Sequence, residues 1–167
     1  MRKSATLITG ANGEIGHGLI TTLYEKNYRN IVAMDLNQPD DSITSYCSEE
    51  IIGNILDVEL IDQLNGEYEI DTIYHLAALL STRAEFAPQS AHDVNVGGTM
   101  NLLNLALEQG RSQGKQIKFF FPSSIAVYGL KNLEEKKFAG AIKENSYRNP
   151  STMYGCNKLY CEHLGSY

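Results

Sequence analysis

The sequence has little cysteine, no excess of positive charge and no long apolar run. Its three cysteines, Cys47, Cys156 and Cys161, are odd in number and have no CxxC or histidine-paired spacing, so we expect free thiols in a reducing compartment and no metal site. The chain has 14 Lys and Arg against 20 Asp and Glu, and its net charge of −6 argues against binding to nucleic-acid phosphates or anionic membranes. No apolar run approaches the ~18 residues of a membrane helix, and too few apolar residues follow Met1 for a signal peptide. These absences predict a cytoplasmic protein without nucleic-acid or membrane partners.

The order of apolar segments predicts the fold. The length of 167 residues suits one domain, and 43% hydrophobic residues allow a core. Expected strands are 5–9, 30–35, 50–54, 72–76 and 118–122, and expected helices are 15–26, 58–64, 90–109 and from 152 onward. Strands with continuous apolar runs, alternating with helices, predict an α/β fold with a parallel sheet covered on both faces. The charged stretch 129–149 is expected to be an exposed loop over the carboxyl edge of the sheet, or alternatively a substrate lid.

A glycine-rich turn follows the first expected strand. Gly10 allows a tight turn, Gly13 lets a pyrophosphate approach backbone N–H groups, and Gly16 lets the next helix pack closely. Asp35 ends the second strand about 20 residues later, where its carboxylate would accept hydrogen bonds from ribose hydroxyls. No basic residue lies between positions 32 and 44, which favours NAD over NADP, and the absence of a GK[ST] sequence excludes a P-loop. The pattern predicts a Rossmann-type, doubly wound dinucleotide-binding domain over 1–167.

A tyrosine and a lysine four residues apart lie near the end of the sequence. On a helix, Tyr154 and Lys158 share one face, so the ammonium group, helped by the positive nicotinamide ring, is expected to lower the pKa of the phenol toward the working range of a base. Ser124, after the fifth strand, can hydrogen-bond the substrate oxygen that loses a proton. His75 ends a buried strand and is expected to be a hydrogen-bonded core residue and not a catalytic acid.

Together these motifs resemble a known family. The sequences TGANGEIG (9–16), HLAALL (75–80), PSSIAVYG (122–129) and YGCNK (154–158), with Asp35 and Asn95, are similar to the extended short-chain dehydrogenase/reductases. More narrowly, they resemble the NAD-dependent epimerase/dehydratase group. The resemblance covers essentially the whole chain, with the motifs in the expected order.

The resemblance implies NAD as the cofactor and assigns residues to it. Ser124, Tyr154 and Lys158 match the catalytic positions, whereas the neighbouring Ser123 has no assigned role. Asn95 would brace the fourth strand from its helix. The implied cofactor-binding residues are Gly10, Asn12, Gly13, Glu14, Ile15, Gly16, Asp35, Asn54, Ile55, Leu76, Ala77, Ala78, Asn95, Tyr154 and Lys158. Within this set, Asn54 and Ile55 would lie beside the adenine, where the family usually has Asp followed by Ile or Val.

Three functions remain open. The first is a sugar-nucleotide epimerase or dehydratase, such as a UDP-glucose 4-epimerase-like enzyme, which oxidises a secondary alcohol transiently. The second is an L-threonine 3-dehydrogenase, because the sequences 75–81, 122–127 and 150–154 resemble those enzymes closely. The third is a non-catalytic NAD-binding protein, against which the intact Ser–Tyr–Lys set argues.

The resemblance also has consequences for length and assembly. Members of this family usually have about half of their length after the YxxxK motif, whereas this sequence stops at Tyr167. We therefore expect an N-terminal fragment without the C-terminal substrate lobe. We also expect a homodimer formed through the helices at 90–109 and 152–167.

Overall fold

The structure, a computed structural model, describes all residues 1–167 and divides into two compact units. The sheet unit comprises Met1–Ala77 and Gly98–Pro122, and the helical unit comprises Ala78–Gly97 and Ser123–Tyr167. Each unit therefore combines two separate stretches of sequence. The single domain expected over 1–167 stays a prediction.

The sheet unit is built on five parallel strands. In chain order they are β1 (Lys3–Thr9), β2 (Ile31–Asp35), β3 (Glu49–Ile52), β4 (Tyr68–His75) and β5 (Lys118–Phe120). Their spatial order is β3-β2-β1-β4-β5, with β1 paired to β2 on one side and to β4 on the other. This is the strand order of the Rossmann fold. The chain adds β2 and β3 on one side of β1 and then crosses to the other side, where it adds β4 and β5, so the switch point of the sheet lies between β1 and β4. The predicted doubly wound parallel sheet is confirmed.

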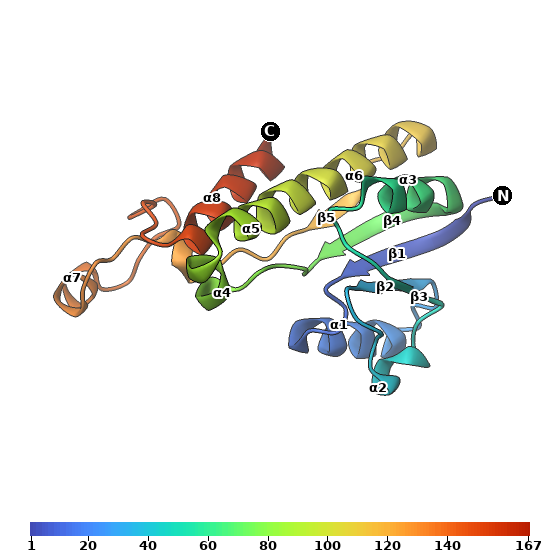
Figure 1. The fold of residues 1–167 in the computed structure, drawn as a ribbon, viewed down its shortest axis with the longest axis horizontal. Helices are drawn as coiled ribbons and strands as arrows, with labels where there is room; N and C mark the ends of the chain where they lie inside the picture. The colour runs from blue at the N-terminus through green and yellow to red at the C-terminus, as the bar shows by residue number, and fades with distance from the viewer. The chain divides into compact units, whose positions relative to one another are not determined.

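Helices cover both faces of this sheet (Figure 1). On one face, α1 (Glu14–Glu25) and α2 (Asp41–Thr44) contribute to a buried apolar cluster with β1 and β2. On the other face, α3 (Val58–Glu67) and α6 (Thr99–Gln113) pack against each other and against β4. Each fully buried Leu or Ile side chain contributes roughly 1.5–3 kcal/mol to such packing. The carboxyl ends of β1, which leads into the glycine loop, and of β4 are thereby held on a rigid support.

Paired polar side chains fix the helices and strands at both ends of this core. His75 is 1% exposed; its Nδ1 lies 2.8 Å from Oγ1 of Thr9 and its Nε2 lies 3.0 Å from Oγ1 of Thr99. At the other end of β4, the buried Gln109 of α6 accepts a hydrogen bond from the Ile70 N–H at 2.9 Å. The prediction that His75 is a hydrogen-bonded core residue is confirmed.

The helical unit contains short helices packed on a longer one. It includes α4 (Ser81–Phe86), α5 (Pro88–His92), the 3₁₀ turn η2 (Ile125–Val127), α7 (Leu133–Ala139) and α8 (Met153–Ser166). Within this unit α8 packs against α4, α5 and η2. No helix of the chain is both long and apolar enough to cross a membrane.

Two sequence predictions need correction. The single helix expected at 90–109 is instead α5, a π-helical turn over Asp93–Gly98 and α6, which ends at Gln113 before a left-handed Gly114 (φ 66°). The stretch 129–149, expected to be a loop, contains α7. Its ends meet, because the Gly129 N–H donates to the carbonyl oxygen of Tyr147 at 2.8 Å. Gly129 is required there, since a Cβ atom would lie 1.7 Å from the Asn149 carbonyl oxygen.

Candidate active site

The glycine loop joins β1 to α1 in the sheet unit, and its glycines meet different demands. Gly10 has φ +71°, and a Cβ there would lie 2.6 Å from the backbone nitrogen of Ala77. A Cβ on Gly16 would lie 2.4 Å from the Ala11 carbonyl oxygen. Gly13, by contrast, would meet only the Gly10 oxygen at 3.3 Å, so its outer side is open. The loop packs tightly inward at Gly10 and Gly16 and leaves its backbone approachable at Gly13.

The N-terminal end of α1 has the features that a pyrophosphate needs. Gly13 is its N-cap and provides no side-chain cap, so the first N–H groups of the helix receive no such hydrogen bond. Glu14 and Ile15 begin the helix and are exposed. An uncapped helix N-terminus beside an open glycine loop suits a phosphate anion. The residues present therefore fit a dinucleotide cofactor.

Asp35 lies at the carboxyl end of β2, beside the glycine loop. Its Oδ2 accepts a hydrogen bond from the Asn12 N–H at 3.0 Å, and its Oδ1 accepts one from the Asn37 N–H at 3.3 Å. The Asn12 side chain holds the segment after β2, because its Oδ1 accepts from the Asp40 N–H and its Nδ2 donates to the Gln38 carbonyl, both at 3.0 Å. Each carboxylate oxygen still has acceptor capacity for a ribose hydroxyl.

Asn54 and Ile55, which are predicted to lie beside the adenine, differ in their surroundings. Asn54 is exposed, and its Oδ1 accepts a hydrogen bond from the Leu56 N–H at 3.0 Å. Ile55 is 5% exposed and packs against Gly98, where a Cβ would lie 2.3 Å from its Cδ1. Ile55 is thus mainly a core residue.

Leu76 and Ala77 follow β4 and are half-buried. The Leu76 N–H donates to the Thr9 carbonyl at 2.9 Å, and Ala77 lies against Gly10, so the turns after β1 and β4 are in contact. This contact lies at the switch point of the sheet, where α/β proteins of this topology bind nucleotides.

In the helical unit, Asn95 lies in the π-helical turn and is 3% exposed. Its Oδ1 accepts from the Leu79 N–H at 2.8 Å and its Nδ2 donates to the Leu79 carbonyl at 3.0 Å. The Cys161 thiol of α8 donates to the Asn95 carbonyl at 3.3 Å. Asn95 therefore fixes the segment that begins at Ala78, which is half-buried.

The helical unit also brings Ser124, Tyr154 and Lys158 together. Ser124 caps η2, with its Oγ accepting the Ala126 N–H at 3.2 Å, and its hydroxyl acts on the pKa of Tyr154. Tyr154 lies in the first turn of α8, which Thr152 caps through the Gly155 N–H at 3.0 Å. The packing of α8 on η2 thus brings the serine and the tyrosine to the same end of α8.

Lys158 is 4% exposed, and its Nζ lies 5.7 Å from the centre of the Tyr154 ring. Burial lowers the pKa of Lys158 to about 8. Burial raises the pKa of Tyr154, and the hydrogen bond from Ser124 opposes that increase. In the chain alone, desolvation of the phenolate therefore dominates the Tyr154 pKa, and the lowering expected from Lys158 together with the nicotinamide ring stays a prediction.

One residue that the sequence reasoning missed holds these groups in place. Gly155 follows Tyr154, and a Cβ there would lie 2.2 Å from the Ala126 carbonyl oxygen and 2.9 Å from Cβ of Pro150. Only glycine lets α8 approach η2 this closely. The sole signal in the sequence is the glycine inside the YGCNK motif.

Comparison with known proteins defines the family. Residues 7–166 match the protein family described as GDP-mannose 4,6 dehydratase. The chain belongs to this family. Uncharacterized epimerase/dehydratases of Staphylococcus saprophyticus and Staphylococcus haemolyticus are 34% and 36% identical to it. Each alignment covers 96% of this chain but 47% and 48% of the relative, so the chain spans about half the length of these curated relatives.

Solved structures show the same fold. A monomeric L-threonine 3-dehydrogenase from a metagenome has a TM-score of 0.81 and 36% identity, over 96% of this chain and 48% of that chain. The L-threonine dehydrogenase of Clostridium difficile has a TM-score of 0.80 and 30% identity, over 100% of this chain and 49% of that one. A UDP-glucose 4-epimerase has a TM-score of 0.79 and 26% identity, over 98% and 46%. The predicted extended short-chain dehydrogenase/reductase, epimerase/dehydratase type, is confirmed.

No group of three or more His, Cys, Asp or Glu side chains in the chain is placed to hold a metal ion. All three cysteines are free thiols, of which Cys161 is buried and Cys156 exposed.

Proposed function

We propose that this chain supplies the cofactor-binding and proton-transfer residues of an NAD-dependent oxidoreductase that acts at a secondary alcohol carbon. The observation that carries the proposal is the Ser124–Tyr154–Lys158 arrangement, in which η2 packs on α8 and the Lys158 ammonium lies over the Tyr154 ring. NAD, when bound, supplies the hydride acceptor at C4 of its nicotinamide.

Tyr154 acts as the base in this proposal. It takes the proton from the substrate hydroxyl as the carbon loses its hydride, and the Ser124 hydrogen bond favours the phenolate that this requires. Lys158, with a pKa of about 8, is mostly protonated at pH 7 and adds positive charge beside the phenol. General-base catalysis of this kind contributes typically ~10²–10⁴-fold to the rate.

The sheet unit provides the cofactor selectivity in this proposal. The open backbone at Gly13 and the start of α1 receive the pyrophosphate, and Asp35 receives the ribose hydroxyls. A 2′-phosphate at that place would face a carboxylate and no basic residue in the segment 33–43. NAD is therefore favoured over NADP.

L-Threonine is the substrate that we favour. Two of the structures above that are named as threonine dehydrogenases are 36% and 30% identical to this chain, against 26% for the UDP-glucose 4-epimerase. The reaction would convert the threonine hydroxyl to a ketone and release NADH. A nucleotide sugar is the second candidate, supported by the match to the GDP-mannose 4,6 dehydratase family.

The test uses the complete protein that contains this sequence. With L-threonine and NAD, NADH absorbance should rise, and Tyr154→Phe should lower turnover by several orders of magnitude while NAD affinity stays unchanged. Conversion of UDP-glucose or GDP-mannose, without net NADH, would instead support the second candidate. NAD binding without turnover of any of these substrates would leave a non-catalytic NAD-binding protein.

We further propose a cytoplasmic homodimer. The cysteines are free thiols, as expected in the cytoplasm, and α6 and α8 retain exposed apolar side chains at Leu107 and Tyr160 that a second copy could cover.

A further inference from the structure

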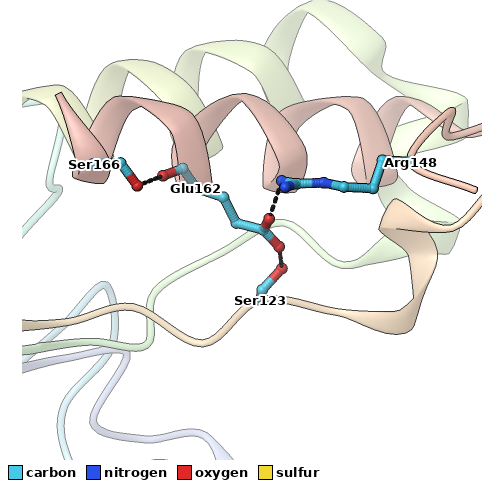
Figure 2. Close-up of polar contacts among 4 residues, drawn as sticks. All are labelled: Ser123, Arg148, Glu162 and Ser166. Atoms are coloured by element: carbon cyan, nitrogen blue, oxygen red, sulfur yellow. Dashed lines mark hydrogen bonds and ion pairs between the residues drawn. The ribbon is translucent and has the colours of Figure 1, made fainter. Parts of the chain in front are cut away.

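A single carboxylate in the helical unit joins three segments of the chain (Figure 2). Glu162 lies on α8, one turn beyond Lys158. Its Oε1 accepts a hydrogen bond from the Ser123 hydroxyl, and its Oε2 lies 2.5 Å from an Nη atom of Arg148. Both contacts are charge-assisted, which makes them shorter and stronger than neutral hydrogen bonds.

The two partners of Glu162 occupy defined positions. Ser123 directly precedes Ser124, the cap of η2, and η2 packs on the helix that carries Tyr154. Arg148 lies at the closed base of the stretch 129–149, between Tyr147 (φ 56°) and Asn149, whose N–H donates to the Tyr147 carbonyl at 2.7 Å. The carboxylate therefore connects the helix that carries the proposed base to the segment that carries its serine.

Stability alone gives a poor reason for this arrangement. The side chains of Arg148 and Glu162 are 32% and 29% exposed, and partly exposed ion pairs contribute little to folding. Geometry gives a better reason, because catalytic hydrogen bonds are sensitive to displacements on the order of 1 Å. Without the bond to Glu162, Ser123 would lose its anchor to α8, and the neighbouring Ser124 would lose a constraint on its backbone.

We propose that Glu162 is a positioning residue, which holds Ser123 and Arg148 so that Ser124 stays in place at the contact between η2 and the first turn of α8, where Tyr154 lies. This inference rests on the proposed function and adds a role for Ser123, a residue to which the family resemblance gives none. Arg148 has the secondary part: it orients the carboxylate and fixes the base of the stretch 129–149.

The test compares Glu162→Ala, Glu162→Gln and Ser123→Ala in the complete protein, with Glu134→Ala, on the exposed face of α7, as the control. Glu162→Ala should lower kcat for L-threonine by tenfold or more, with NAD affinity unchanged within twofold. Its kcat–pH profile should shift its ascending limb to higher pH, because the phenolate of Tyr154 loses stabilisation. Glu162→Gln, which can still accept from Ser123, should recover most of kcat. Ser123→Ala combined with Glu162→Ala should be no worse than Glu162→Ala alone.

A second measurement is independent of turnover. Tyrosine labelled with ¹³C at Cζ, with the Tyr154 signal assigned by its loss in Tyr154→Phe, reports the titration midpoint of this phenol directly. The midpoint should rise in Glu162→Ala and Ser123→Ala and stay in place in Glu134→Ala. If the wild-type protein turns over neither substrate class, the proposed function is wrong. The titration midpoint of Tyr154 then still tests the positioning role of Glu162. An unchanged midpoint in Glu162→Ala and Ser123→Ala, or a kcat within twofold of wild type, would overturn it.

Discussion

The contact between α8 and η2 leads to a sharp prediction for Gly155→Ala. The new Cβ would lie 2.2 Å from the Ala126 carbonyl oxygen, which is backbone and cannot rotate away. Since ordinary contacts begin at about 3.4 Å, α8 and η2 must separate by roughly 1 Å. Such overpacking costs typically ~1–3 kcal/mol, while replacing glycine in a helix returns up to ~1 kcal/mol. We expect a net loss of about 1–2 kcal/mol in the free energy of unfolding.

The effect on activity should exceed the effect on stability. Tyr154 adjoins Gly155, and Ser124 lies two residues before Ala126, so the separation moves the serine away from the phenol. A displacement of this size can cost ~10²-fold in rate. The complete protein should therefore show a kcat for L-threonine lowered about 100-fold, measured by NADH absorbance, with NAD affinity retained.

Gly165→Ala is the matched control. Gly165 also lies on α8, but nothing lies within 4 Å of a Cβ placed there. This variant should be as stable as wild type or slightly more stable, and fully active. Thermal unfolding and kcat measured side by side decide the matter: a Gly155→Ala protein that matches Gly165→Ala in both would refute the steric reasoning.

Three further predictions follow. Asp35→Ala should narrow the preference for NAD over NADP, measured by titration calorimetry, because the variant no longer repels a 2′-phosphate; a wild-type preference for NADP would contradict the assignment. Lys158→Met should change how the free energy of unfolding depends on pH. The pKa of Lys158 is about 8 in the folded protein and 10.5 in the unfolded chain, so between these pH values the unfolded chain binds more protons than the folded protein does. Wild type should therefore gain stability relative to Lys158→Met as the pH rises from 8 to 10.5, by up to about 3 kcal/mol in chemical denaturation; a constant difference would contradict the pKa of Lys158. The homodimer should appear in sedimentation at tens of micromolar and weaken in Leu107→Glu, whereas a monomer throughout would remove this proposal.

The sequence allowed the sheet to be predicted because its signals are local. Each strand is a short apolar run, and the glycines of the loop fall between a strand and a helix, so residue order alone indicates the topology. The same holds for Tyr154 and Lys158, whose spacing of four residues places both on one helix face. Local pattern and tertiary structure agree at these positions.

The features that sequence reasoning missed depend on distant partners. Gly155 is needed because of Ala126, and Glu162 acts through Ser123, which is 39 residues away. No periodicity within α8 could indicate either contact. The raised pKa of Tyr154 is of the same kind, since it results from burial, which the YxxxK spacing does not report.

The three glycines of the loop differ in whether the fold itself requires glycine at their position. Gly10 and Gly16 are required by the protein itself, because a Cβ at either would lie within 2.6 Å of backbone atoms. Gly13 has φ −77° and no contact closer than 3.3 Å, so the fold would accept a side chain there. Asp40 and Asp57 cap α2 and α3 with their side chains, and glycine at the N-cap costs a helix only about a few tenths of a kcal/mol relative to such a residue. Because neither the turn nor the start of α1 requires glycine at position 13, the open backbone there suits a group that approaches from outside the protein, as the pyrophosphate of NAD would.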